Sequence, residues 1–237
     1  MRPFALLLAT LPVVLAGVIT PIIIDLGNST SIGITADESD ANLIQIVSVT
    51  TQGRGCPAGS VASIISPDRT VVTLGYDSFR AYIGPTPRGR RRGRNGRATR
   101  EEESSNCTIR LKLKYPGGHT VSVVQTTFHG FAVLDPGVTG IFESRYGFGN
   151  GPQSALVTSS IEGNEERSTI GEQYTATGSF PDDRRVYAPC GEEIDLVIQT
   201  TINLRSRNET GSGSLNDEDA TIALTQQVNL AFEPCVS

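Results

Sequence analysis

Apolar and polar residues alternate along much of this chain. The clearest stretch is 108–115, where apolar residues are separated by Arg and Lys. Stretches 194–204 and 222–232 also place an apolar residue at almost every second position. A period of two puts alternate side chains on opposite faces of a strand, one face packed and the other in water. The residues expected to face inward are Ile109, Leu111, Leu113, Tyr115, Ile194, Leu196, Ile198, Ile202, Leu204, Ile222, Leu224, Val228, Leu230 and Phe232.

Weaker strand patterns fill much of the remaining chain, and strong turn sequences separate them. Turns are expected at Ser66-Pro67-Asp68, Pro116-Gly117-Gly118 and Asp135-Pro136-Gly137, where Pro, Gly and Asp favour tight turns. No long window repeats apolar residues at helical spacing. The pattern predicts an all-β fold, an antiparallel two-sheet β-sandwich of jelly-roll or Greek-key type. Its further strands are expected at 43–51, 61–65, 70–76, 120–128, 140–148, 155–161 and 174–180.

The first residues have the composition of an export signal. Met1-Arg2 is basic, 4–19 is almost wholly apolar, and Val14 and Ala16 suit cleavage after Ala16. The apolar run is short for a membrane span and no stop-transfer cluster follows, so we expect no stable membrane insertion. We therefore expect a secreted protein, extracellular or associated with the cell wall. Its parts are expected to be a signal peptide at 1–16, an N-terminal segment or propeptide at 17–41, and a single sandwich domain at 42–237.

Four cysteines follow this leader: Cys56, Cys107, Cys190 and Cys235. An even number behind an export signal indicates two disulfides, not a metal site or a thiol catalyst. Four cysteines allow three pairings. We favour Cys56 with Cys107 and Cys190 with Cys235, because the alternating stretches after Cys190 and before Cys235 are natural neighbours.

Three glycosylation sequons agree with secretion, at Asn28, Asn106 and Asn208. Asn28 and Asn208 lie in polar stretches that a glycosylating enzyme could reach. At Asn106 the sequon contains Cys107, and a disulfide that formed first would block it.

An arginine-rich stretch interrupts the strand pattern, and we expect 85–105 to be a disordered loop because it has no apolar anchor. One reading is a polyanion-binding loop, and another is a processing site at Arg90-Arg91-Arg92. We favour a third, a tolerated surface insertion. The net charge of −5, the acidic run after the arginines and the lack of aromatic residues there speak against nucleic acid. The arginines are Arg88, Arg90, Arg91, Arg92, Arg94, Arg97 and Arg100.

No catalytic motif stands out. The only histidines are His119, expected as a solvated turn residue, and His129, expected on a strand in a surface or face-filling role. Asp217 and Asp219 lie in an acidic loop and are weak Ca²⁺ candidates, without the spacing of a calcium loop. We expect no metal and no cofactor. The chain has no Trp to stack on a sugar, so the candidates for exposed aromatic residues are Tyr76, Tyr82, Tyr146 and Tyr187.

An ordered series of motifs from about residue 44 to Cys235 resembles a family of small secreted fungal proteins, known as domain of unknown function four-three-six-zero. The resemblance implies a secreted, cysteine-bonded protein without an established activity, so no catalytic residue can be carried over. The arginine-rich stretch replaces a short loop of that family, and His129 stands where the family has Arg. The motifs are Gly55-Cys56-Pro57-Ala58-Gly59-Ser60, Ser66-Pro67-Asp68-Arg69-Thr70, Asn106-Cys107, Tyr115-Pro116-Gly117-Gly118, Phe131-Ala132-Val133-Leu134-Asp135, Pro189-Cys190-Gly191 and Cys235.

The sequence favours a non-enzymatic extracellular protein that binds a cell-wall or host-surface glycan. One alternative is a secreted hydrolase acting on glycans or esters. Another is an effector or inhibitor that meets a host protein through the arginine-rich loop. The sequence leaves the ligand and the oligomeric state open.

Overall fold

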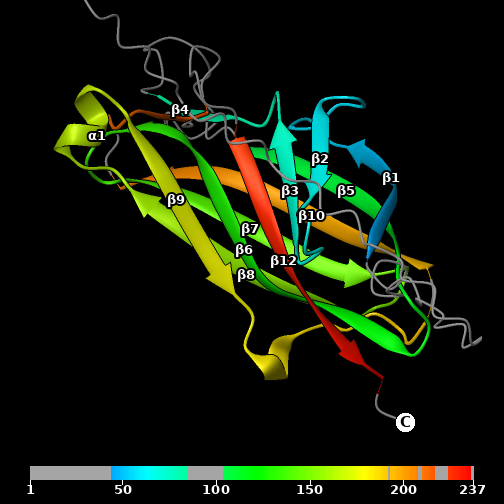
Figure 1. Ribbon diagram of the computed structural model, residues 1–237. Helices are drawn as coiled ribbons and strands as arrows, with labels where there is room; N and C mark the ends of the chain where they lie inside the picture. Colours follow the sequence, from blue (N-terminus) through cyan, green and yellow to red (C-terminus); the bar gives the residue numbers. More distant parts are fainter. Residues whose placement is uncertain (1–43, 85–103, 192, 208–209, 217–223, 236–237) are drawn as a thin grey trace, which may run out of the picture. The chain divides into compact units, whose positions relative to one another are not determined.

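The computed structural model describes residues 44–84, 104–191, 193–207, 210–216 and 224–235 (Figure 1). The expected signal peptide, the segment 17–41 and the arginines of the insert lie outside these residues. The same is true of Asn28, Asn208, Asp217 and Asp219.

Two antiparallel sheets form the fold (Figure 1). In order, sheet A contains β1 (Gln45–Gln52), β5 (Ser104–Lys114), β10 (Glu193–Ser206), β7 (Val138–Phe148) and β8 (Ser154–Glu162). Sheet B contains β2 (Val61–Ile65), β3 (Val71–Tyr76), β12 (Leu224–Pro234), β6 (His119–Leu134), β11 (Gly213–Leu215) and β4 (Ala81–Ile83), and β9 (Glu172–Ser179) pairs with β6. The described helices are α1 (Glu165–Thr169) and the 3₁₀ turn η2 (Asp182–Arg184). The predicted all-β, two-sheet fold is confirmed.

Alternation along the strands builds a core between the two sheets. In β5 the inward side chains of Ile109, Leu111 and Leu113 are almost fully buried, as predicted, and the basic residues between them are exposed. Leu196 on β10 and Val228 on β12 join the same buried cluster from different sheets. Burying one such side chain contributes about 1.5–3 kcal/mol. Phe232 differs from the prediction, because it lies beyond the core near the end of β12 and keeps 37% of its surface exposed.

A hydrogen-bonded polar network lies inside this core and joins the sheets. Its centre is Gln226 of β12, which has no exposed surface. The hydroxyl of Tyr76 donates to Gln226 Oε1 at 2.5 Å, and Gln226 Nε2 donates to the hydroxyl of Tyr146 at 2.8 Å. Ser144 and Thr200 of sheet A share a hydrogen bond of 2.9 Å beside them. The network satisfies the amide that would otherwise make burial costly.

The expectation that Tyr76 and Tyr146 are exposed is therefore wrong. Their exposed fractions are 2% and 1%, because both lie on the inward side of their strands with their hydroxyls bonded to Gln226. Tyr82 and Tyr187 are exposed, at 55% and 39%.

Two disulfides connect distant parts of the chain, Cys56 with Cys107 and Cys190 with Cys235. These are the pairs that the sequence favours. Their sequence separations of 51 and 45 residues correspond to about 4 kcal/mol of stabilisation each, if the crosslink acts by restricting the unfolded chain.

The shortest elements and some boundaries differ from the sequence pattern. β4 and β11 have three residues each and α1 has five, which is too short for a periodic signal. β5 begins at Ser104, so the last two residues of the expected disordered loop, Ser104 and Ser105, are part of a strand. β6 continues to Leu134, well past the predicted end at Phe128.

Candidate functional site

The two sheets present outer faces of different chemistry. The outer face of sheet A is charged: Arg110, Lys112 and Lys114 alternate along β5, and Glu143 and Arg145 follow one another on the outer side of β7. The centre of the outer face of sheet B contains no Asp, Glu, Lys or Arg in the part of the chain that the structure describes. We treat the two faces in turn.

The centre of the sheet B face is a grid of hydroxyl and amide side chains, which we call the neutral face. The strand register aligns them in rows: Thr225, His129 and Thr175 form one row. The next rows are Gln227, Thr127 and Thr177, then Asn229, Gln125 and Ser179. The neutral face consists of Thr73, Gln125, Thr127, His129, Thr175, Thr177, Ser179, Thr225, Gln227 and Asn229, all half-buried or exposed except Thr127.

Hydrogen bonds orient only part of the neutral face. Gln125 Nε2 donates to Thr127 Oγ1 at 3.3 Å, and the hydroxyls of Thr127 and Thr177 lie 3.3 Å apart. His129 Nδ1 lies 3.0 Å from the hydroxyl of Thr175. By contrast, the side chains of Thr225, Gln227 and Asn229 form no hydrogen bond with any residue that the structure describes. Their donors and acceptors face solvent and are free for a ligand.

A hollow of about 280 Å³ lies on the opposite, charged face, over β5, β10 and β7. We call it the arginine pocket. Arg110 comes from β5 and Arg145 from β7, and Val197 and Gln199 of β10 lie between them in register. The loop from β7 to β8 forms one wall. The lining residues are Arg110, Arg145, Gly147, Gly149, Asn150, Gly151, Pro152, Gln153, Ser154, Val197 and Gln199.

Two glycines shape this pocket. Gly147 lies on its floor, and a Cβ there would be 3.0 Å from the carbonyl oxygen of Gln153. Gly149 has a φ of +61° and donates its backbone N–H to the carbonyl of Asp195 at 2.7 Å. That left-handed conformation favours glycine and turns the chain into the wall loop. The Gly-Asn-Gly-Pro run at 149–152 forms this wall. Its sequence predicts a loop, but it does not predict that the loop borders a pocket.

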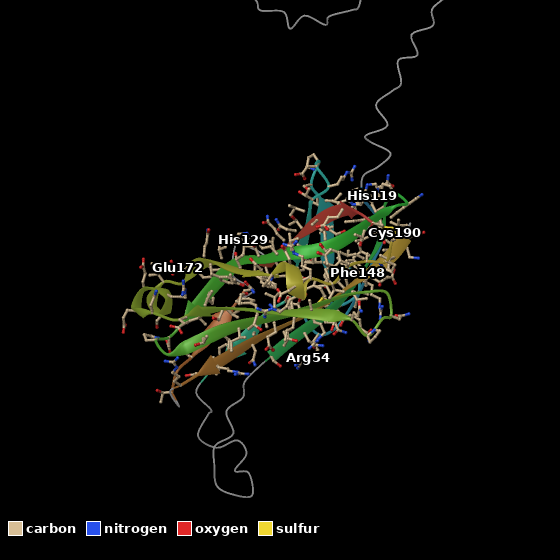
Figure 2. All side chains as sticks on the ribbon, turned by 90° about the horizontal axis from the view of Figure 1, so that it is seen from below. Arg54, His119, His129, Phe148, Glu172 and Cys190 are labelled. Carbon is tan, nitrogen blue, oxygen red and sulfur yellow. A yellow bond between two sulfur atoms is a disulfide. The ribbon has the colours of Figure 1, made fainter. Side chains whose placement is uncertain are left out.

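The histidines do not belong to a common site. His119 and His129 lie ten residues apart along β6, about 30 Å at the rise of a strand, and Figure 2 shows them well separated. His119 stacks on Phe232 with ring centroids 4.5 Å apart, and its Nδ1 lies 3.3 Å from the carbonyl of Gly117. It is thus a half-buried residue beside the turn, packed more closely than a solvated residue would be.

The other predicted sites are scattered. Asn106 is exposed on β5, on the same outer face as Arg110. Within the described residues no three His, Cys, Asp or Glu side chains gather in a way that could hold a metal ion. Among the described helices none is long and apolar enough to cross a membrane.

A curated relative and two solved structures are similar to this chain. A curated relative from the fungus Arthroderma benhamiae, called an uncharacterized secreted protein, is 29% identical over 84% of this chain and 74% of its own length. Two solved structures share 8% and 9% identity. The first is TmCBM61 in complex with beta-1,4-galactotriose (TM-score 0.23, covering 81% of this chain and 91% of that one), and the second is Eiger TNF from S. frugiperda (TM-score 0.26, 80% and 96%).

The disulfides and the secreted relative agree with the predicted location: this protein is secreted. The family model described as Domain of unknown function (DUF4360) matches residues 42–235, nearly the whole of the predicted domain. The chain belongs to the DUF4360 family.

Proposed function

We propose that this protein is a non-enzymatic binding protein for a neutral extracellular polysaccharide, and that the neutral face holds the polymer. The observation that carries the proposal is the grid of hydroxyls and amides without a charged residue, spread over β3, β12, β6 and β9.

The chemistry of this grid matches an uncharged, hydroxyl-rich partner. Ser and Thr hydroxyls and Asn and Gln amides donate and accept hydrogen bonds, as sugar hydroxyls do. A surface without Asp, Glu, Lys or Arg also avoids burying a charge that a neutral polymer cannot pair. Neighbouring strands lie about 4.8 Å apart, and outward residues repeat about every 6.8 Å along each strand. The grid can therefore meet several sugar units of one chain at once.

We expect the polymer to make contact at the free side chains in the middle of the grid. Thr225, Gln227 and Asn229 share strand β12, which lies between β3 and β6, so all three are surrounded by other members of the neutral face. No large aromatic side chain belongs to the grid. We therefore expect modest affinity for a single sugar and measurable retention only on a polymer.

The hydrolase alternative rests on one contact, His129 Nδ1 with the Thr175 hydroxyl at 3.0 Å. Among the described residues no carboxylate is hydrogen-bonded to His129 to orient it as a general base. The effector alternative depends on the arginine-rich loop, which lies outside the described residues.

The test is a depletion assay of the mature protein on chitin, β-glucan, mannan and cellulose. We expect retention on at least one of them. The variant Gln227→Glu keeps the shape of the side chain and adds a charge in the middle of the grid. We expect it to weaken retention about tenfold, which corresponds to about 1.4 kcal/mol.

The matched control is Gln52→Glu, the same change on exposed β1 of the other sheet. It should be retained like the unmodified protein. Equal retention of Gln227→Glu and Gln52→Glu would show that the neutral face does not bind the polymer. Retention on none of the four polymers would refute the proposed function.

A further inference from the structure

We propose that the arginine pocket is a second binding site, and that it takes the carboxylate of an acidic sugar, a uronic acid. It lies on sheet A, on the other outer face from the neutral face, and the argument for it does not depend on the function proposed above.

The pocket concentrates positive charge in an acidic protein. Among the described residues its lining contains the guanidinium groups of Arg110 and Arg145 and no carboxylate, while the whole chain carries a net charge of −5. Arg110 forms no hydrogen bond or ion pair with any residue that the structure describes. A guanidinium left without an acidic partner above a strand face is available for an anion from solution.

The acidic residues nearest in register are engaged elsewhere or stay apart. Glu193 pairs with Lys112 at 3.8 Å. Asp195 stands opposite Lys112 in register, and its carboxylate forms no ion pair with Arg110 among the described contacts. Glu143, the next outward residue on β7, forms no ion pair with Arg145 among the described contacts. Neither guanidinium of the pocket is therefore tied up in an ion pair with a described carboxylate.

Arg145 is held in place and can receive a ligand without first being ordered. Its Nη1 donates to the hydroxyl of Ser154 across the β7–β8 pair at 3.1 Å. Gln199 lies beside it in register. A side chain that is already restrained loses less conformational entropy on binding.

The fork of N–H groups on each guanidinium fits a planar carboxylate, which it can bind through two parallel hydrogen bonds. The remaining polar groups of the lining are amides, from Asn150, Gln153 and Gln199, which suit hydroxyl groups. This combination distinguishes an acidic sugar from a free inorganic anion. Neither an uncharged sugar nor a bare carboxylate uses all of these groups.

The size of the pocket agrees with a small ligand. Its volume of about 280 Å³ is just below the range of about 300–1,000 Å³ that holds a drug-sized molecule. Gly147 contributes to this space, because a side chain there would fill the room beside Gln153 and Ser154. The pocket therefore accommodates one or two sugar units, such as the end or a branch of an acidic chain.

The test is an NMR titration of the full mature chain with glucuronate, glucose and acetate, following the Arg110 side-chain N–H and the backbone N–H of Gly147 and Gly149. Glucose lacks the carboxylate and acetate lacks the sugar. We expect glucuronate to bind with a Kd at least tenfold lower than either of the other two. We also expect Arg110→Gln to raise that Kd at least tenfold.

The control is Arg205→Gln, which removes one exposed charge from β10 of the same face but outside the pocket. Its Kd should be unchanged, and thermal unfolding checks that both variants are folded. Equal binding of acetate would reduce the pocket to a simple anion site, and equal binding of glucose would remove the role of the carboxylate. Equal losses in Arg110→Gln and Arg205→Gln would show an effect of net charge alone. Each of these three results would overturn the proposal.

Depletion on neutral polysaccharide separates this inference from the proposed function. Arg110→Gln should leave that retention unchanged, and Gln227→Glu should leave glucuronate binding unchanged. Either proposal can therefore fail while the other stands.

Discussion

Replacing Gln226 by Leu tests whether the polar network in the core acts as one unit. The substitution keeps a side chain of similar size but removes the amide that bonds Tyr76 and Tyr146. The Tyr76 hydroxyl then loses the only hydrogen bond it forms among the described residues, and an unsatisfied buried hydroxyl costs about 1–3 kcal/mol. Tyr146 keeps the hydroxyls of Thr126 and Ser144 as neighbours, so its loss is about 1 kcal/mol. We expect a total of about 2–4 kcal/mol.

The assay is equilibrium unfolding in urea with both disulfides intact. Tyr76→Phe removes the hydroxyl that donates to Gln226 Oε1. In the double variant Tyr76→Phe/Gln226→Leu both partners of this hydrogen bond are gone, so no Tyr76 hydroxyl is left buried without a partner. The double variant should therefore lose about 1–2 kcal/mol less than the sum of the two single losses. Additive losses would refute the reasoning, because they would mean that Tyr76 and Gln226 contribute independently. A Gln226→Leu variant as stable as the original chain would refute it too.

Two further predictions concern pH and backbone packing. Burial raises the pKa of Tyr146 from its ordinary 10.0 to about 12, so between these two pH values only the unfolded chain loses the proton. The contribution of Tyr146 to stability is constant below pH 10 and falls by roughly 3 kcal/mol as pH rises through this window, at about 1.4 kcal/mol per unit. Burial also raises the pKa of Tyr76 and Tyr174, so urea midpoints measured against pH should fall more steeply than this in the original chain, and Tyr146→Phe should make the fall shallower without abolishing it. Gly130→Ala places a Cβ 2.2 Å from Asn216 Oδ1 and should cost about 1–3 kcal/mol. Gly117→Ala is the control, since no atom lies within 4 Å of a Cβ there, and equal melting temperatures for the two variants would contradict this account.

Most of the fold could be predicted from the alternation of apolar and polar residues within single strands. This works because a strand buries one face whichever strand it pairs with. The run from Ile109 to Leu113 illustrates this, since its inward residues are all buried in β5. The polar centre of the core was not predictable in the same way. Gln226 occupies an inward position that the apolar pattern of 222–232 skips, and its hydrogen bonds with Tyr76, Tyr146 and neighbouring hydroxyls explain it.

Neither proposed binding surface could be predicted from the sequence, because both depend on strand order. Arg110 and Arg145 lie 35 residues apart in the chain and come together only because β10 pairs with β5 on one side and β7 on the other. The neutral face likewise needs β12 beside β6. Hydrophobic periodicity predicts which face of a strand is exposed to solvent, but it does not predict which strands lie side by side in the sheet.

The C-terminal strand β12 lies in the middle of sheet B, between β3 and β6. During synthesis it is therefore the last of the described strands to emerge, yet β3 and β6 depend on it to complete the sheet. Until it arrives, β3 is paired along only one edge, with the short strand β2. The core must close after the whole chain has entered the secretory pathway, and a chain shortened before Leu224 would leave sheet B in two separate parts.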